Sequence, residues 1–307
     1  MNKKKIASVI IPAFNEQKHI QNTLQSLAQA NSLEVIVVDN GSTDNTAAIA
    51  KQHGAMVIDF PYGTIAAVRN RGVAASASDI LIFIDADVNV STDWHAQLGS
   101  VIQKLHASPL LVTGSRVQSA EKSNWLHTFW FSQLTSYSAP YINSGHLITS
   151  RILFDKIQGF SEHLETAEDY DFCQKASGVG GVIQNNADLV VTHDGYPETL
   201  SGFIRRERWH GRQDVDTWQL YIASKLAWFA SLNLILFLIA IAMTLAGMHM
   251  ALPVYFLIMY MVSFLLTVYK FGLRKINYML VMPVIFYFYL CGRSLAIVDR
   301  LTGRKRR

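Results

Sequence analysis

Residues 226–269 form an uninterrupted stretch of 44 residues without Asp, Glu, Lys or Arg. A helix needs about 20 apolar residues to cross the hydrocarbon core of a bilayer, so this stretch has room for two. Helices that cover a soluble core keep a polar face toward water, and this stretch has none. We therefore predict a membrane region over residues 221–307, with spans at about 226–248 and 252–269.

A third apolar segment is shorter, because residues 276–292 contain no charged side chain over only 17 positions. Basic side chains at residues 270–275 precede it, and a basic cluster at residues 304–307 follows it. Basic residues beside membrane segments favour the cytoplasmic side, and a third span would place these two groups on opposite sides. A two-span hairpin with an interfacial or re-entrant helix at about 276–298 fits this bias. Three full spans remain the alternative.

The basic charge of the chain is concentrated in this tail. Residues 1–225 carry 18 basic against 22 acidic side chains, whereas residues 226–307 carry 9 against 1. A basic and apolar tail indicates binding to anionic lipid headgroups rather than to a nucleic acid polymer. We expect an integral protein of the cytoplasmic (inner) membrane whose N-terminal domain lies in the cytoplasm. The two cysteines, one in each half, fit a reducing compartment.

The first 115 residues alternate between short β-branched runs and helical patterns, which predicts an α/β fold with a mostly parallel sheet covered by helices on both faces. We assign residues 1–220 to this domain. Asp44 and Ser91 precede two of the helical patterns as candidate N-caps. The expected strands are residues 7–11, 34–38, 56–60, 80–84 and 110–113, and the expected helices are residues 16–29, 46–52, 65–77 and 92–105.

Polar clusters follow three of the expected strands, at residues 12–16, 39–44 and 85–87. In sheets of this kind ligands bind at the carboxyl ends of the strands. The three clusters are therefore expected to meet at one edge of the sheet and to form a binding site.

Four short motifs occur in a fixed order: Pro12-Ala-Phe-Asn-Glu16, Val38-Asp-Asn-Gly-Ser-Thr-Asp44, Asp85-Ala-Asp87 and Glu168-Asp169. Their order and their places at strand ends resemble the family 2 glycosyltransferases over residues 6–209. The resemblance implies a GT-A fold, which is Rossmann-like, followed here by the α-helical membrane region. It also implies a nucleotide-sugar donor, for which we expect a UDP-linked sugar.

The resemblance assigns the donor nucleotide to the first three motifs and to the expected helix of residues 65–77, which carries Arg71. It implies that Asp39 accepts the N3–H of a uracil-like base, although Asn40 stands where many relatives carry a second Asp. Arg71 is expected to neutralise phosphate, because a guanidinium forks onto phosphate oxygens. The expected donor-binding residues are Pro12, Ala13, Phe14, Glu16, Asp39, Gly41, Ser42, Arg71, Asp85 and Ala86.

Asp85 and Asp87 are two positions apart at a strand end, so their carboxylates point the same way. A cation relieves the repulsion between them, and oxygen ligands suit Mg²⁺ or Mn²⁺. We expect Asp87 to bind a divalent metal and Asp85 to bind ribose or the metal. The resemblance adds His193 as a residue that approaches the metal or the pyrophosphate.

The resemblance implies that Asp169 is the base that takes the proton of the acceptor hydroxyl, and that Glu168 binds the acceptor side. Gln158 and Lys175 depart from the family pattern around this pair. Arg208 and Trp209 resemble the Arg-Trp signature of polysaccharide synthases and could bind pyrophosphate and an acceptor sugar. The same basic stretch could instead meet lipid headgroups.

These features predict an inverting, metal-dependent glycosyltransferase that acts on a lipid-linked sugar or a polyprenyl-phosphate-type acceptor in envelope glycan synthesis. One alternative is a subunit of a processive polysaccharide synthase, which would need a homo-oligomer or a pathway partner to form a channel. The other alternative is a non-catalytic scaffold of an envelope glycan assembly.

Overall fold

The computed structural model describes residues 5–29, 32–119, 124–134 and 141–303. The basic cluster at residues 304–307 lies outside the described residues. The chain divides into two compact units: residues 1–120 with 137–195, and residues 121–136 with 196–307.

The first unit is built on a seven-stranded sheet in the order β3-β2-β1-β4-β8-β6-β9. The strand β8 runs antiparallel to both of its neighbours, and every other pair in the sheet is parallel. This confirms the predicted mostly parallel α/β sheet. The strands are β1 (Ala7–Ala13), β2 (Leu33–Asp39), β3 (Met56–Asp59), β4 (Ile80–Ile84), β6 (Leu111–Gly114), β8 (His146–Ser150) and β9 (Val182–Asn185).

A second, three-stranded sheet lies beside the end of β4. Its strand β10 (Val191–His193) pairs antiparallel with β5 (Val88–Val90) and parallel with β7 (Gln118–Ser119). The register places His193 opposite Val88, directly after the Asp85–Asp87 motif.

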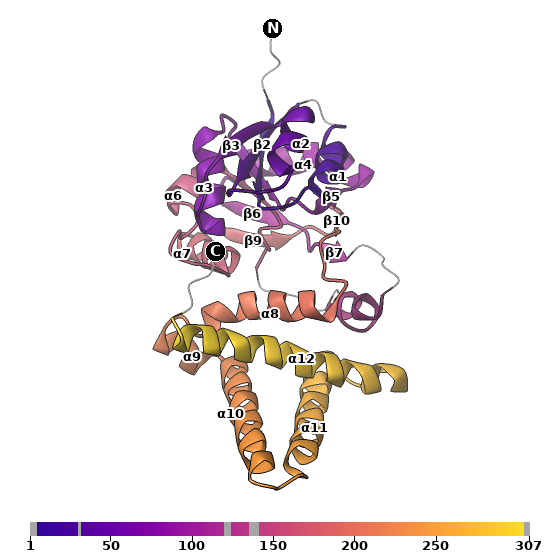
Figure 1. Cartoon of the computed structure of the whole chain (residues 1–307). Helices are drawn as coiled ribbons and strands as arrows, with labels where there is room; N and C mark the ends of the chain where they lie inside the picture. Colours follow the sequence, from indigo (N-terminus) through magenta and orange to yellow (C-terminus); the bar gives the residue numbers. More distant parts are fainter. Residues whose placement is uncertain (1–4, 30–31, 120–123, 135–140, 304–307) are drawn as a thin grey trace. The chain divides into compact units, whose positions relative to one another are not determined.

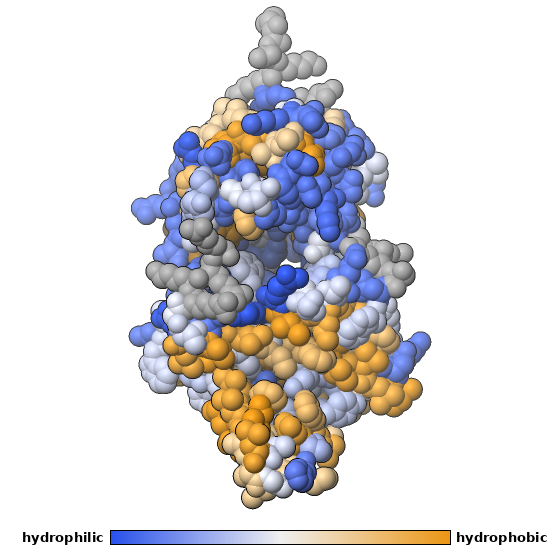
Figure 2. Space-filling model, in the orientation of Figure 1, coloured by the Kyte–Doolittle hydropathy of each residue, from blue (hydrophilic) through white to orange (hydrophobic). Residues whose placement is uncertain are grey.

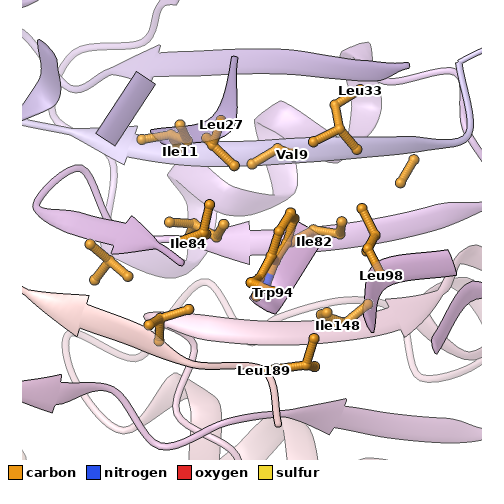
Figure 3. Packing of buried hydrophobic residues seen from close by; sticks show 14 of the residues in the cluster. Val9, Ile11, Leu27, Leu33, Ile82, Ile84, Trp94, Leu98, Ile148 and Leu189 are labelled. Atoms are coloured by element: carbon orange, nitrogen blue, oxygen red, sulfur yellow. The ribbon is translucent and has the colours of Figure 1, made fainter. Parts of the chain in front are cut away.

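Helices cover both faces of the larger sheet, because successive strand residues point to opposite sides. Val9, Ile11, Ile82 and Ile84 belong to one core with side chains of α1, α2 and α4, and Figure 3 shows Trp94 of α4 between Ile82 and Ile84 of this core. The alternate strand residues belong to a second core with α3, α6 and α7. The helices are α1 (Ile20–Leu27), α2 (Thr46–Gln52), α3 (Ile65–Ala75), α4 (Thr92–Ala107), α6 (Arg151–Lys156) and α7 (Glu168–Gly178).

The predicted elements of the first 115 residues are all present, and most of their boundaries lie within two residues of those predicted; the largest shift is at the start of the first helix. Helix α1 begins at Ile20 rather than at residue 16, because Asn15 has a φ of 57°, which is not helical. The backbone N–H groups of Asn15 and Glu16 also donate to the side chains of Ser42 and Thr46. The Ser91 hydroxyl caps α4 by accepting the Trp94 N–H. Asp44 lies one residue before the N-cap of α2, and its carboxylate accepts the Thr46 N–H at 3.0 Å.

The second unit contains three helices that are long and apolar enough to cross a membrane: α10 (Lys225–Leu245), α11 (Ala251–Phe271) and α12 (Ile276–Leu301). Helices α10 and α11 form a hairpin, and α12 runs across its open end (Figure 1). Hydrophobic side chains cover the surface of the hairpin (Figure 2). The shorter elements of this unit are η1 (His127–Phe131), α5 (Ser132–Leu134), α8 (Leu200–Asp214) and α9 (Trp218–Ala223).

Helix α8 packs along α12, and small residues allow the close approach. A Cβ at Gly292 would lie 2.7 Å from the Glu207 Cβ, and one at Gly211 would lie 2.9 Å from the Ala296 Cβ. Helix α8, which the sequence analysis places in the domain of residues 1–220, belongs to the second compact unit, as does α9, which crosses that predicted boundary.

Candidate active site

The loops after β1 and β2 are bonded to each other. The Asn15 N–H donates to Ser42 Oγ at 2.9 Å, and the Thr43 N–H donates to Asn15 Oδ1 at 2.8 Å. The Glu16 N–H donates to Thr46 Oγ1 at 2.8 Å. Because each loop supplies donors and acceptors to the other, the first two polar clusters of the sequence form one surface at the sheet edge.

Asp39 ends β2 and is only 6% exposed. Its Oδ1 accepts hydrogen bonds from the Ser42 N–H at 3.2 Å and from the Ser42 hydroxyl. Gly41 has a φ of 82°, a conformation that favours glycine. Pro12 and Ala13 are buried in β1, whereas Phe14 is 52% exposed at its end.

Asn40 has a role that the sequence analysis did not find. Its Nδ2 donates to the Gly63 carbonyl and its Oδ1 accepts the Gly63 N–H, both at 2.9 Å. The loop between β3 and α3 is thereby attached to the end of β2.

Glu16, Asp85 and Asp87 form an acidic cluster. Burial, and then repulsion from Asp87, Asp85 and Asp44, raises the pKa of Glu16 to about 8. Burial and then Asp85 raise the pKa of Asp87 to about 7. Acids that repel one another to this extent would be stabilised by a cation bound among them.

His193 and Asp87, the two residues predicted to bind the metal, lie close to each other. The His193 Nε2 is 3.4 Å from Asp87 Oδ2. The backbone holds the two segments in register, because the Asp194 N–H donates to the Asp87 carbonyl at 2.8 Å. Among the described residues no group of three or more His, Cys, Asp or Glu side chains could hold a metal ion alone.

Gly195 leaves no room for a side chain beside this pair. A Cβ there would lie 1.7 Å from Asp87 Oδ2, so an added methyl group would push the carboxylate away. We expect Gly195→Ala to weaken binding of Mn²⁺ in the presence of UDP by about tenfold to a hundredfold. Isothermal titration calorimetry measures this affinity.

Gly99→Ala provides the matched control, since a Cβ at Gly99 in α4 meets nothing within 4 Å. It should bind Mn²⁺ as the unaltered protein does. Equal affinities for the two variants would contradict the placement of Asp87 in the metal site.

Arg69, which the sequence analysis passed over, connects two of the predicted motifs. Its side chain is 2% exposed and contacts Asp85 at 2.8 Å and Glu168 at 2.6 Å. Arg71, the predicted phosphate ligand, is exposed. Residues two positions apart on a helix point to nearly opposite sides, so only one of these arginines can face the acids. The signal in the sequence was the helical spacing of Arg69 from the buried Ala66 and Val73.

Glu168 and Asp169 begin α7, after Ala167 with a φ of 57°. Asp169 is 7% exposed. Its Oδ1 accepts the Tyr170 N–H at 2.7 Å and its Oδ2 accepts a hydrogen bond from Asn143 Nδ2 at 2.9 Å. Burial and then the neighbouring Glu168 raise the pKa of Asp169 to about 7.

The turn Asn143–Ser144–Gly145 contacts Asp85 on one side and the Glu168–Asp169 pair on the other, and no sequence motif marked it. The Ser144 hydroxyl donates to Glu168 at 3.0 Å, and the Gly145 N–H donates to Asn143 Oδ1 at 2.8 Å. A Cβ at Gly145 would lie 2.9 Å from Asp85 Oδ2. This turn and Arg69 are two separate connections between Asp85 and the Glu168–Asp169 pair.

Arg208 and Trp209 belong to the second unit. Asp299 of α12 accepts hydrogen bonds from two nitrogens of the Arg208 guanidinium, one of them at 2.6 Å. Trp209 is 39% exposed. The structure thus gives Arg208 a partner inside its own unit, and the predicted contacts of both residues with pyrophosphate and acceptor stay predictions.

With this geometry established, comparisons with known proteins identify the class of protein. The profile of Glycosyl transferase family 2 matches residues 8–164, about half of the chain. The chain therefore belongs to glycosyl transferase family 2 and is an enzyme that transfers sugars.

Among its relatives is glycosyltransferase AglE of Haloferax volcanii, 23% identical over 231 residues that cover 69% of this chain and 74% of the relative. The 4,4'-diaponeurosporenoate glycosyltransferase of Staphylococcus haemolyticus is 42% identical over 104 residues, 31% of this chain and 27% of that protein. Most of the second relative is therefore not matched by this chain.

Solved structures show the same fold over nearly the whole chain. The mannosyltransferase PcManGT from Pyrobaculum calidifontis, in complex with GDP-Man and Mn²⁺, has a TM-score of 0.58 at 18% identity. The match covers 99% of this chain and 89% of that one. Residues 1–349 of S. aureus TarS, in complex with UDP-GlcNAc, have a TM-score of 0.50 at 16% identity, covering 98% and 93%.

Proposed function

We propose that this chain is an inverting, metal-dependent glycosyltransferase that moves a sugar from a UDP-linked donor to a lipid-linked or other membrane-held acceptor in envelope glycan synthesis. The observation that carries the proposal is the continuous network of acids at the sheet edge. Glu16, Asp85 and Asp87 repel one another at one end, and Arg69 joins Asp85 to the Glu168–Asp169 pair at the other.

Asp87 and His193, with Asp85 beside them, would hold Mg²⁺ or Mn²⁺. A site with few protein ligands suits these ions, which commonly complete their coordination with substrate phosphates and water. The bound ion supplies charge neutralisation for the departing nucleoside diphosphate. The Mn²⁺ bound to the mannosyltransferase, which shares this fold, supports a divalent ion here.

Asp169 would take the proton of the acceptor hydroxyl. Arg69 neutralises Glu168, so of the two carboxylates only that of Asp169 would be left to act as a base. Attack by the deprotonated oxygen on the anomeric carbon, opposite the departing diphosphate, inverts the configuration at that carbon. Asp39 would accept the N–H of the nucleotide base.

The rate should depend on pH through Asp169. Its folded pKa of about 7 lies above the ordinary value of 3.8, so the carboxyl is protonated and inactive as a base below about pH 7. We expect kcat/KM to rise with pH and to level off above about pH 7. The same shift means that the contribution of this carboxyl to stability, full below pH 3.8, is lost as pH rises through 7.

Asn143→Ala tests that assignment, because it removes a hydrogen bond that favours the ionised carboxylate. The inflection of the pH–rate profile should move upward in this variant. A profile that stays where it was would argue that Asp169 does not control the rate.

The membrane placement is also a proposal. Helices α10 and α11 would enter the bilayer as a hairpin, and α12 would lie at the interface with α8, on the cytoplasmic side with the catalytic domain. The support is the pair of lysines at the open end of the hairpin, Lys225 at the start of α10 and Lys270 in the last turn of α11, together with the partly buried ion pairs between α8 and α12.

Donor identity and the choice between single and repeated transfer can be tested with purified protein. Thermal unfolding with Mn²⁺ and either UDP-sugars or GDP-sugars should show a stability increase for the UDP series. Transfer to a polyprenyl phosphate should add one sugar. A ladder of products would instead favour the processive synthase, and a stability increase with GDP-sugars alone would overturn the UDP assignment.

A further inference from the structure

An aromatic cluster in the second unit surrounds one lysine. Trp130 of η1 packs against Phe203, Phe271, Phe286 and Tyr289 at centroid distances of 5.4 to 5.6 Å. The Lys270 ammonium, at the end of α11, lies 5.1 Å from the Trp130 ring centroid. It lies 5.3 to 6.0 Å from the rings of Phe271, Tyr289 and Phe286.

The charges near Lys270 do not balance. Arg206 donates to Glu207 at 2.7 Å. Arg293 donates to Asp214 at 2.7 Å and to Glu207 at 3.3 Å. Glu207 is 2% exposed, so it is available only to these neighbours. Two acids thus face three cations, and the two arginines use both of them.

Lys270 keeps an unused hydrogen-bonding capacity. Over the described ranges, residues 5–29, 32–119, 124–134 and 141–303, its ammonium makes no ion pair or hydrogen bond to a protein oxygen. Aromatic faces attract the charge but supply no acceptor oxygen for its three N–H groups. The residue is exposed, so an anion from outside can reach it.

We propose that Lys270 and the aromatic cluster around Trp130 bind the phosphate group of a membrane lipid phosphate. This inference rests on the proposed function, in which the acceptor is membrane-held. A lysine ammonium binds phosphate as a compact point charge, and aromatic side chains favour the level of the headgroups. Lys270 lies at the open end of an apolar hairpin, where a lipid headgroup would be presented beside apolar chain.

The test compares Lys270→Gln with Lys225→Gln in the full chain. Lys225 is an exposed lysine at the same end of the hairpin, and among the described residues its ammonium makes no cation–π contact. The affinity of each variant is measured on zwitterionic vesicles that contain a polyprenyl phosphate. Lys270→Gln should weaken this binding by about tenfold, whereas Lys225→Gln should bind within about twofold of the unaltered protein.

Two further binding measurements distinguish a lipid phosphate from free inorganic phosphate as the anion that Lys270 binds. Vesicles that contain the matching polyprenol should not distinguish the variants, and millimolar inorganic phosphate should not displace the protein from the polyprenyl phosphate vesicles. Equal losses in Lys270→Gln and Lys225→Gln would show general attraction to headgroups and overturn the proposal. Displacement by inorganic phosphate would overturn the lipid assignment.

Donor hydrolysis in detergent without any acceptor, measured on the unaltered protein, tests the proposed function separately. If the unaltered protein hydrolyses the donor but Lys270→Gln does not weaken vesicle binding, the lysine site alone is rejected. Absence of metal-dependent hydrolysis would reject the proposed function itself.

Discussion

Asp169→Asn is expected to lower kcat by about a thousandfold while the protein still binds its donor. The amide cannot accept the proton of the acceptor hydroxyl at neutral pH. It has the shape of the carboxyl and can still accept the Tyr170 N–H or the Asn143 amide proton, so the start of α7 should be preserved. Initial transfer rates and calorimetric titration with donor in the presence of Mn²⁺ measure the two effects.

Asp171→Asn makes the same chemical change two residues further along α7. Asp171 accepts a hydrogen bond from Ser161 and lies 3.3 Å from the Lys175 ammonium, away from the acidic network. Its variant should keep a rate within a few-fold of the unaltered protein. An Asp169→Asn enzyme with full turnover would remove Asp169 from the mechanism.

Asp87→Asn should weaken metal-dependent donor binding by about a hundredfold or more, because a charged metal ligand is lost. It should not weaken the fold. Glu16, Asp85 and Asp87 repel one another, so removal of one charge should leave the metal-free protein as stable as before or more stable at pH 8. Thermal unfolding with and without Mn²⁺ and UDP reports both quantities.

Asp93→Asn, in the exposed first turn of α4, is the control for a lost surface charge. It should retain the stability increase that Mn²⁺ and UDP produce. If Asp87→Asn retained that increase as well, the metal would have to be bound elsewhere in the protein.

The sheet and its helices were predictable because local patterns determine them. Buried strands such as β4 are short apolar runs bounded by turns, and the ends of parallel strands meet at one edge, which placed Asp39, Asp85 and Asp87 at the same edge of the sheet. The long apolar helices of the hairpin followed from length and composition alone.

Contacts between distant segments were harder to predict. Arg69 was passed over in favour of Arg71, because the choice depends on which face of α3 meets residues 85 and 168. The Asn143–Gly145 turn has no motif, and its role comes only from the fold that brings it to Asp169. Helix α8 was placed with the catalytic domain because its polar sequence does not show that its charges pair with those of α12.

Asn40 illustrates what one atom changes at this sheet edge. An aspartate there could accept the Gly63 N–H but could not donate to the Gly63 carbonyl. One of the two hydrogen bonds that hold the loop before α3 would therefore be lost. The amide also contributes no charge near the proposed nucleoside diphosphate. Asn40 therefore makes this surface both stiffer and less repulsive to an incoming polyanion than an aspartate at the same position would.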